Sequence, residues 1–239
     1  MLGCSIDCDT SLEDIMSEYS PFADSPVPNP EDIFTIIFTI IYTSGTTGNP
    51  KGVMHAHETP GHVVPGLVET MRLQGDENRF FSFLPMSHAA ERIIVEMNSL
   101  YANGSVSFSE GLETFGDEIR SVQPTFFFAV PRLWVKFKQG VDAMIPPEAQ
   151  SNLSAEQKEG IARQLGLAEA RFILTGSAPC PRDVQNWFLD MGIALRDGYG
   201  MTENFVHGCG WVHNDQPVSG CVGRPMDDSV QVRISSACT

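Results

Sequence analysis

The stretch YTSGTTGNPKG, from Tyr42 to Gly52, combines hydroxyl side chains, glycines and one lysine. Its glycines permit unusual backbone angles and let main-chain N–H groups approach a ligand closely. Such a loop suits the β- and γ-phosphates of a nucleotide, because hydroxyls and N–H groups donate to phosphate oxygens and a lysine adds one positive charge. We therefore predict a phosphate-binding loop formed by Thr43, Ser44, Gly45, Thr46, Thr47, Gly48 and Lys51.

A second kind of phosphate loop, the P-loop, has the pattern G-x-x-x-x-G-K-[ST]. Gly45 and Lys51 have the separation of that pattern, but Pro50 occupies the place of its second glycine. Gly52 stands where the hydroxyl that binds Mg²⁺ belongs. We therefore exclude a P-loop. A plain Gly/Thr turn remains an alternative, although such a turn needs only about two special residues.

Charge and composition limit the partners of this loop. The chain of 239 residues has 30 acidic and 15 basic residues, which gives a net charge of −15. Nucleic-acid binding needs a cationic stripe that releases counterions, and no Lys/Arg cluster supplies one. We therefore predict no nucleic-acid partner, and any bound phosphate must be held locally.

The chain also lacks an obvious membrane or export signal. Its longest apolar run, 33–41, is about half of the roughly 20 residues that span a bilayer. The start, MLGCSIDCD, has neither a basic region nor an apolar signal core. We predict a cytoplasmic protein whose 6 scattered cysteines are reduced, and leave peripheral membrane contact open.

The predicted phosphate-binding loop must be positioned by strands and helices, and the sequence alternates between apolar runs typical of strands and patterns typical of helices. After a poorly ordered lead-in or linker over 1–31, we predict a buried parallel strand that ends at the loop, a helix over 57–73 and further strand–helix units up to a last strand over 229–235. This alternation predicts an α/β fold, with a mainly parallel sheet covered by helices on both faces. Ligands of such sheets bind beyond the carboxyl ends of the strands. Three loops therefore meet there: TSGTTGNPKG, TGSAP and DGYGMTEN.

Five motifs occur in an order that is similar to a known family: YTSGTTGNPKGVMHAH, FLPMSHAAER, LTGSAP, DGYGMTEN and GCVGRPM. Over 32–234 the chain resembles the adenylate-forming (AMP-binding) superfamily. PMSHAAER and PRLWVKF look most like the long-chain fatty acyl-CoA synthetases. The resemblance implies that a carboxylic acid attacks ATP to form an acyl-adenylate and pyrophosphate, after which coenzyme A takes the acyl group. The expected acid is a fatty acid.

The resemblance also implies roles for single residues, and the residue types suit them. Tyr199 would stack on adenine, Thr202 would donate to the α-phosphate, and Glu203 would bind Mg²⁺, which prefers oxygen ligands. Asp197 would contact the adenine amino group, and His88 would lie beside the substrate carboxylate. The backbone along the nucleotide would come from Gly176, Ser177, Ala178, Pro179, Gly198 and Gly200.

Alternatives remain for His88 and for two other clusters. His88 could instead form a local hydrogen bond at a helix start. His55, His57 and His62, and the later set of His207, Cys209, His213 and Cys221, lack the close paired spacing of structural zinc sites. We expect Gly208, Cys209 and Gly210 to be small walls of a substrate channel.

The resemblance covers only part of the family's pattern. A ribose-binding aspartate and a lysine-bearing C-terminal domain would follow the GRP motif in relatives, so we expect 32–239 to be a partial AMP-binding domain. A non-catalytic nucleotide-binding remnant of the same fold is the alternative. An unrelated α/β hydrolase is disfavoured, because no G-x-S-x-G motif is present.

Overall fold

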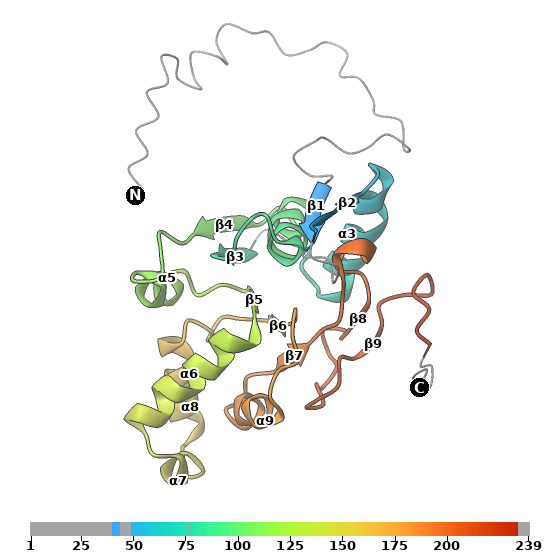
Figure 1. The fold of residues 1–239 in the computed structure, drawn as a ribbon. Helices are drawn as coiled ribbons and strands as arrows, with labels where there is room; N and C mark the ends of the chain where they lie inside the picture. Colours follow the sequence, from blue (N-terminus) through green and yellow to red (C-terminus); the bar gives the residue numbers. More distant parts are fainter. Residues whose placement is uncertain (1–39, 44–48, 76, 234–239) are drawn as a thin grey trace, which may run out of the picture.

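The computed structural model describes residues 40–43, 49–75 and 77–233 (Figure 1). The predicted lead-in of 1–31, most of the apolar run 33–41, and Ser44, Gly45, Thr46, Thr47 and Gly48 lie outside the described residues. The bounds below therefore refer to the remaining chain.

The first described element is a hairpin and not a buried parallel strand. Strand β1 (Ile40–Thr43) pairs antiparallel with β2 (Lys51–Met54), and Thr43 lies opposite Lys51. Ile41 is buried, whereas the side chains of Ile40 and Tyr42 are exposed. The prediction of a strand buried on both faces is wrong for this part, because a hairpin can leave one face in water.

The centre of the fold is parallel. Strand β3 (Arg79–Ser82) pairs with β4 (Ser105–Phe108), and β6 (Phe172–Thr175) lies between β5 (Phe126–Ala129) and β7 (Leu195–Asp197). The N–H of Thr125 donates to the carbonyl of Arg79 over 2.9 Å, so the two sheets meet at β3 and β5. The predicted α/β fold with a mainly parallel sheet is confirmed.

The helices follow the predicted alternation, with shorter bounds. They are α3 (Glu58–Thr70), the π-helix η1 (Glu91–Met97), α4 (Asn98–Tyr101), α5 (Phe115–Val122), α6 (Pro131–Met144), α7 (Pro147–Gln150), α8 (Ala155–Gln164), α9 (Arg182–Asp190) and the 3₁₀ helix η2 (Thr202–Asn204). Short strands β8 (Cys209–Gly210) and β9 (Arg224–Pro225) pair antiparallel. The predicted last strand over 229–235 is wrong for its described part, because 229–233 form no strand.

Side chains alternate between the two faces of the central strands, so each face of the sheet packs into its own hydrophobic core. Phe126 and Phe128 of β5 face helices α3 and η1, whereas Phe127 and Ala129 face α5, α6, α8 and α9. Successive side chains of a strand point to opposite faces, so a strand that is apolar throughout must be covered on both. This burial makes the sheet a fixed support for the loops at its carboxyl edge. Within 40–43, 49–75 and 77–233, no helix has the length and apolar composition needed to cross a membrane.

Candidate functional site

One cavity of about 430 Å³ lies where the chain leaves three strands at their carboxyl ends. Thr43 and Lys51 of the hairpin line it, as do the residues that directly follow β6 and those that follow β7. Parallel strands bring their carboxyl ends to one edge, which explains why segments far apart in sequence meet here. The three loops expected to meet therefore do so, as far as they are described.

Most of the predicted site residues reach this cavity. Its lining includes Thr43, Lys51, His88, Gly176, Ser177, Gly198, Tyr199, Gly200, Thr202 and Glu203. Ala178, Pro179 and Asp197 are not part of the lining. The roles of Ser44, Gly45, Thr46, Thr47 and Gly48 stay predictions, since these residues lie outside the described chain.

The cavity has a polar part and an apolar part. The polar groups are hydroxyls and the charged groups of Lys51 and Glu203. The apolar residues come from six segments: Leu67, Met71, Ile94, Phe128, Phe172, Leu174, Trp211 and Met226. A ligand with a charged head and an apolar tail matches such a lining.

The sequence-based reading missed Thr175, the last residue of β6. The residue belongs to the cavity lining and is fully buried, and its hydroxyl has no hydrogen-bond partner in the described chain. Buried polar groups are normally satisfied, so this unpaired hydroxyl next to the cavity makes Thr175 a candidate site residue. The motif LTGSAP contains this threonine and could have indicated it.

The loop after β6 is held in a strained form against the loop after β7. Ser177 has φ of 67°, in the left-handed region that favours glycine. A Cβ atom added to Gly176 would lie 3.2 Å from the carbonyl oxygen of Gly198. The two loops are therefore in close backbone contact, and strain of this kind concentrates at binding sites.

Tyr199 presents its ring at the cavity from a fixed backbone. Its N–H donates to the carbonyl of Cys209 over 2.9 Å, and the N–H of Cys209 donates back over 2.8 Å. The side chain remains 52% exposed. An aromatic ring that is open on one side and fixed at its base can stack on a planar ligand. Cys209 and Gly210 line the cavity as expected for small walls, whereas Gly208 lies behind Tyr199.

Glu203 lies on η2, whose turn is closed by both backbone and side-chain hydrogen bonds. The N–H of Met201 donates to Asn204 Oδ1 over 2.9 Å, and Phe205 and Val206 follow with φ of 55° and 58°. Glu203 is exposed and lines the cavity, and it forms no ion pair within the described residues. Its carboxylate is thus available to a cation or to a donor of a ligand.

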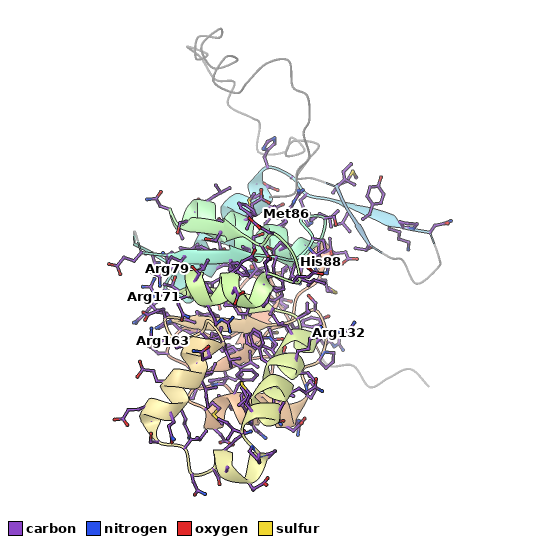
Figure 2. The ribbon with its side chains drawn as sticks, turned by 90° about the vertical axis from the view of Figure 1, so that its left-hand side faces the viewer. Arg79, Met86, His88, Arg132, Arg163 and Arg171 are labelled. Atoms are coloured by element: carbon purple, nitrogen blue, oxygen red, sulfur yellow. The ribbon has the colours of Figure 1, made fainter. Side chains whose placement is uncertain are left out.

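His88 forms a local hydrogen bond and also belongs to the cavity lining. Its Nδ1 accepts a hydrogen bond from the N–H of Ala90 over 3.1 Å, which is the local bond of a helix start. The same side chain lines the cavity, and Figure 2 shows it on the side of the molecule that also carries Arg132. Because Nδ1 accepts, a neutral His88 carries its proton on Nε2. The ring can therefore donate to an anionic ligand.

Asp197 faces away from this cavity. Its Oδ2 accepts from Gln185 Nε2 over 3.0 Å and from the N–H of Cys180 over 3.4 Å. Burial raises the pKa of this carboxyl, and those donors oppose the shift. In the structure the side chain fixes α9 to β7, while its carbonyl oxygen accepts from Trp211 over 2.9 Å.

Comparison with known proteins places the chain in a family. The pattern of the AMP-binding enzyme family matches residues 5–237. Fatty acyl-CoA synthetase A of Dictyostelium discoideum is 31% identical, over 88% of this chain and 34% of that protein. Long chain acyl-CoA synthetase 3 of Arabidopsis thaliana is 27% identical, over 87% of this chain and 36% of that protein. The chain thus spans about a third of the length of these relatives.

Solved structures give the same placement. The ATP-bound crystal structure of MatB from Rhodopseudomonas palustris matches 82% of this chain and 34% of that one, with a TM-score of 0.63 and 26% identity. The inhibitor-bound N-terminal domain of FACL13 from Mycobacterium tuberculosis matches 71% of this chain and 38% of that one, with a TM-score of 0.55 and 26% identity.

Proposed function

The chain belongs to the AMP-binding enzyme family, and we propose that it carries the nucleotide-binding part of a ligase that uses ATP to activate a carboxylic acid. The acid would form an acyl-adenylate and then a thioester with coenzyme A. One observation carries the proposal: the hairpin lysine, the loop after β6 and the loop after β7 line a single cavity.

A fatty acid is the proposed substrate class. The relatives with 30% identity or more include the long-chain-fatty-acid–CoA ligase 6 of Mus musculus, which is 30% identical over 84% of this chain and 32% of that protein. Ala90 and Ile94, in the helical segment that follows His88, also line the cavity. A carboxylate at His88 would thus have apolar walls for its chain.

The polar lining suits the adenylation step. Attack of a carboxylate on the α-phosphate needs in-line positioning and neutralisation of the charge that develops on pyrophosphate. Lys51 supplies a positive charge at the hairpin, Thr202 a hydroxyl for the α-phosphate, and Tyr199 a ring for adenine. His88 would hold the substrate carboxylate through Nε2–H.

Glu203 fits the magnesium ion that such a nucleotide carries. Mg²⁺ usually binds through one or two carboxylates together with substrate phosphates and waters. Glu203 is a free carboxylate on the cavity, and the described residues hold no group of three or more acidic, histidine or cysteine ligands that could form a protein-only metal site. When bound, the ion would neutralise phosphate charge. A cytoplasmic location stays a prediction from composition.

Binding of nucleotide to the chain itself tests the proposal. Mg²⁺-ATP at roughly a hundred times its dissociation constant should stabilise the chain by about 2.7 kcal/mol, which thermal melting detects. Tyr199→Ala should reduce that shift, while Tyr101→Ala, at an exposed tyrosine outside the cavity, should not. A folded chain whose melting does not respond to ATP would contradict the proposal.

A second measurement separates the ligase from a non-catalytic remnant. The remnant is kept as an alternative because the chain spans about a third of its relatives. A full-length form should exchange pyrophosphate into ATP only when a fatty acid is present. ATP binding without any exchange in that form would favour the remnant.

A further inference from the structure

A second cavity, of about 390 Å³, lies at the opposite edge of the central sheet. Its lining comes from α8 and from the segments that lead into β6 and β7, whereas the nucleotide cavity is lined by the segments that leave these strands. Figure 2 shows Arg171 on one side of the molecule and His88 and Arg132 on the other. The two cavities are therefore separated by the length of the strands.

Positive charge gathers at this second cavity. Lys158, Arg171 and Arg196 line it, and the acidic residue on its wall, Glu159, pairs with Arg163 over 3.2 Å. Such a gathering is unexpected in a chain with a net charge of −15. Three cations at one cavity therefore need a physical reason.

Neutral acceptors hold two of these cations in place. Lys158 Nζ donates to the carbonyl of Asp190 over 2.7 Å, and Arg171 Nη2 donates to Asn78 Oδ1 over 2.7 Å. Neither forms an ion pair within the described residues. Their positions are thus fixed while their charges stay uncompensated, which is the arrangement of an anion-binding site.

Arg196 forms the rigid wall of the cavity. Its side chain is 5% exposed, lies over the ring of Phe172 at 4.6 Å, and donates from Nη2 to the carbonyl of His213 over 2.8 Å. Its Nε is buried and has no partner in the described chain. Asp215 accepts from Arg196 Nη2 through its backbone carbonyl over 3.4 Å, while its carboxylate pairs with Arg224 over 3.3 Å. The guanidinium is therefore held by backbone carbonyls and forms no ion pair within the described residues.

His213 lies outside the cavity lining and accepts from Arg196 Nη2 through its backbone carbonyl. Burial lowers the pKa of its imidazole, and Arg196, Arg72 and Arg171 lower it further. Like charges disfavour the protonated ring, so the field at His213 is positive. An anion near these arginines would reduce that repulsion.

The rest of the cavity lining is small and apolar: Ala155, Ala162, Leu167, Ala168, Ala170, Ile173, Met191, Gly192, Ile193 and Ala194. We propose that this cavity is a second ligand site, which binds a small organic anion with a carboxylate or phosphate head and an apolar remainder. The head contacts Lys158 and Arg171, and the apolar part packs on the alanine and isoleucine side chains. The site is separate from the nucleotide cavity and does not depend on its assignment.

Methionine methyl groups make the proposal testable site by site. Met191 lines the second cavity, whereas Met71 and Met226 line the nucleotide cavity. In NMR spectra of the methyl-labelled chain without nucleotide, octyl phosphate and octanoate should shift the Met191 signal. Octanol, which lacks the charge, should not. If the site prefers a carboxylate head, octanoate should shift the Met191 signal more than octyl phosphate does. If it prefers a phosphate head, octyl phosphate should give the larger shift.

Variants then test the charges. Arg171→Gln and Lys158→Gln should each reduce the affinity for the anion that shifts the Met191 signal by about tenfold, or roughly 1.4 kcal/mol. Ala155→Glu should also weaken it, because it places a carboxylate on the cavity wall at an exposed helix start without removing a contact. Arg132→Gln is the control for general charge, since Arg132 is exposed and lies outside the linings of both cavities.

Three outcomes would overturn the proposal. The first is that neither anion shifts Met191. The second is that both anions shift only Met71 and Met226. The third is that Arg132→Gln weakens binding as much as Arg171→Gln does. The last result would mean that the anions respond to general surface charge.

Discussion

His55 packs edge to face on Phe205, with ring centroids 4.9 Å apart and an interplanar angle of 73°. His55 directly follows β2, which begins at Lys51, and Phe205 directly follows η2, which carries Thr202 and Glu203. One buried contact therefore joins the hairpin lysine to the turn with the acidic residue. Because the two groups would act on the same bound phosphates, their spacing depends on this contact.

We expect His55 to make stability depend on pH. Burial lowers the pKa of its imidazole from the ordinary value of 6.5, while Thr202 and Glu203 oppose the shift. Below that value the unfolded chain binds a proton that the folded chain resists, so stability falls as the pH drops through and below 6.5. His55→Phe keeps a ring against Phe205 but cannot bind a proton. Its unfolding free energy should therefore decrease less than that of the wild type between pH of about 7.5 and about 5.5.

Urea denaturation at both pH values checks this expectation, and the difference between wild type and variant isolates His55 from other titrating groups. His62→Gln, which removes an exposed histidine from α3, is the control. Identical pH dependence in His55→Phe and wild type would show that burial of the His55 imidazole does not reduce stability at low pH.

Glu203→Gln tests the magnesium role. The substitution keeps the size of the side chain and removes the charge that Mg²⁺ needs. In a full-length form, fatty-acid-dependent exchange of pyrophosphate into ATP should fall by at least roughly two orders of magnitude, or about 2.7 kcal/mol of transition-state stabilisation. Glu58→Gln, outside the cavity lining, should retain exchange. Near-normal exchange by Glu203→Gln would remove this carboxylate from the metal site.

Glu91 should lower stability at neutral pH. Its side chain is fully buried at the start of η1, and burial raises its pKa to about 7. Ser82 and the N–H groups of Phe83 and Leu84 oppose that shift, although neither carboxyl oxygen forms a hydrogen bond of normal geometry. Between its ordinary value of 4.5 and about 7 the folded chain keeps a proton that the unfolded chain releases, so stability falls as the pH rises through this range.

Glu91→Gln removes this penalty. The variant should be more stable than the wild type at pH of about 8, by up to about 3 kcal/mol, and the gain should shrink towards pH of about 5. Glu113→Gln, at an exposed position, should leave the pH profile unchanged. A variant that is less stable at every pH would mean that the carboxyl forms contacts that an amide cannot replace.

The parallel centre could be predicted because two of its strands, β5 and β6, are almost entirely apolar. Phe126–Ala129 and Phe172–Thr175 have no polar face, so they must be covered on both sides, and alternating helices supply the cover. Strand β2 could not be predicted this way. Its sequence, KGVM, includes a glycine and a lysine, which are weak strand formers, and pairing with β1 decides its conformation.

The position of the site could also be predicted, since the carboxyl ends of parallel strands share one edge. The orientation of single side chains at that edge could not. Asp197 ends β7 and points to α9, while Gly198, one residue later, lines the cavity. A shift of one residue reverses the face of a strand, and sequence patterns locate strand ends less accurately than that.

Gly208 offers a test of how Tyr199 is held. A Cβ atom at Gly208 would overlap with the carbonyl oxygen of Tyr199 and lie 3.3 Å from its Cδ1 atom. Backbone cannot yield as a flexible side chain does, so Gly208→Ala must displace the Tyr199 ring from the cavity. We expect ATP affinity to fall by at least roughly tenfold, or about 1.4 kcal/mol. Tyr199→Ala combined with Gly208→Ala should add little further loss, because both changes act on one ring.

Gly160→Ala is the matched control for Gly208→Ala. A Cβ atom at Gly160 meets nothing within 4 Å, and the residue lies in α8 away from the nucleotide cavity. That variant should raise stability by about 0.4–1 kcal/mol, since alanine reduces the freedom of the unfolded chain, and should bind ATP normally. If Gly208→Ala also bound ATP normally while folding as the wild type does, the Tyr199 ring could not be the surface on which adenine stacks.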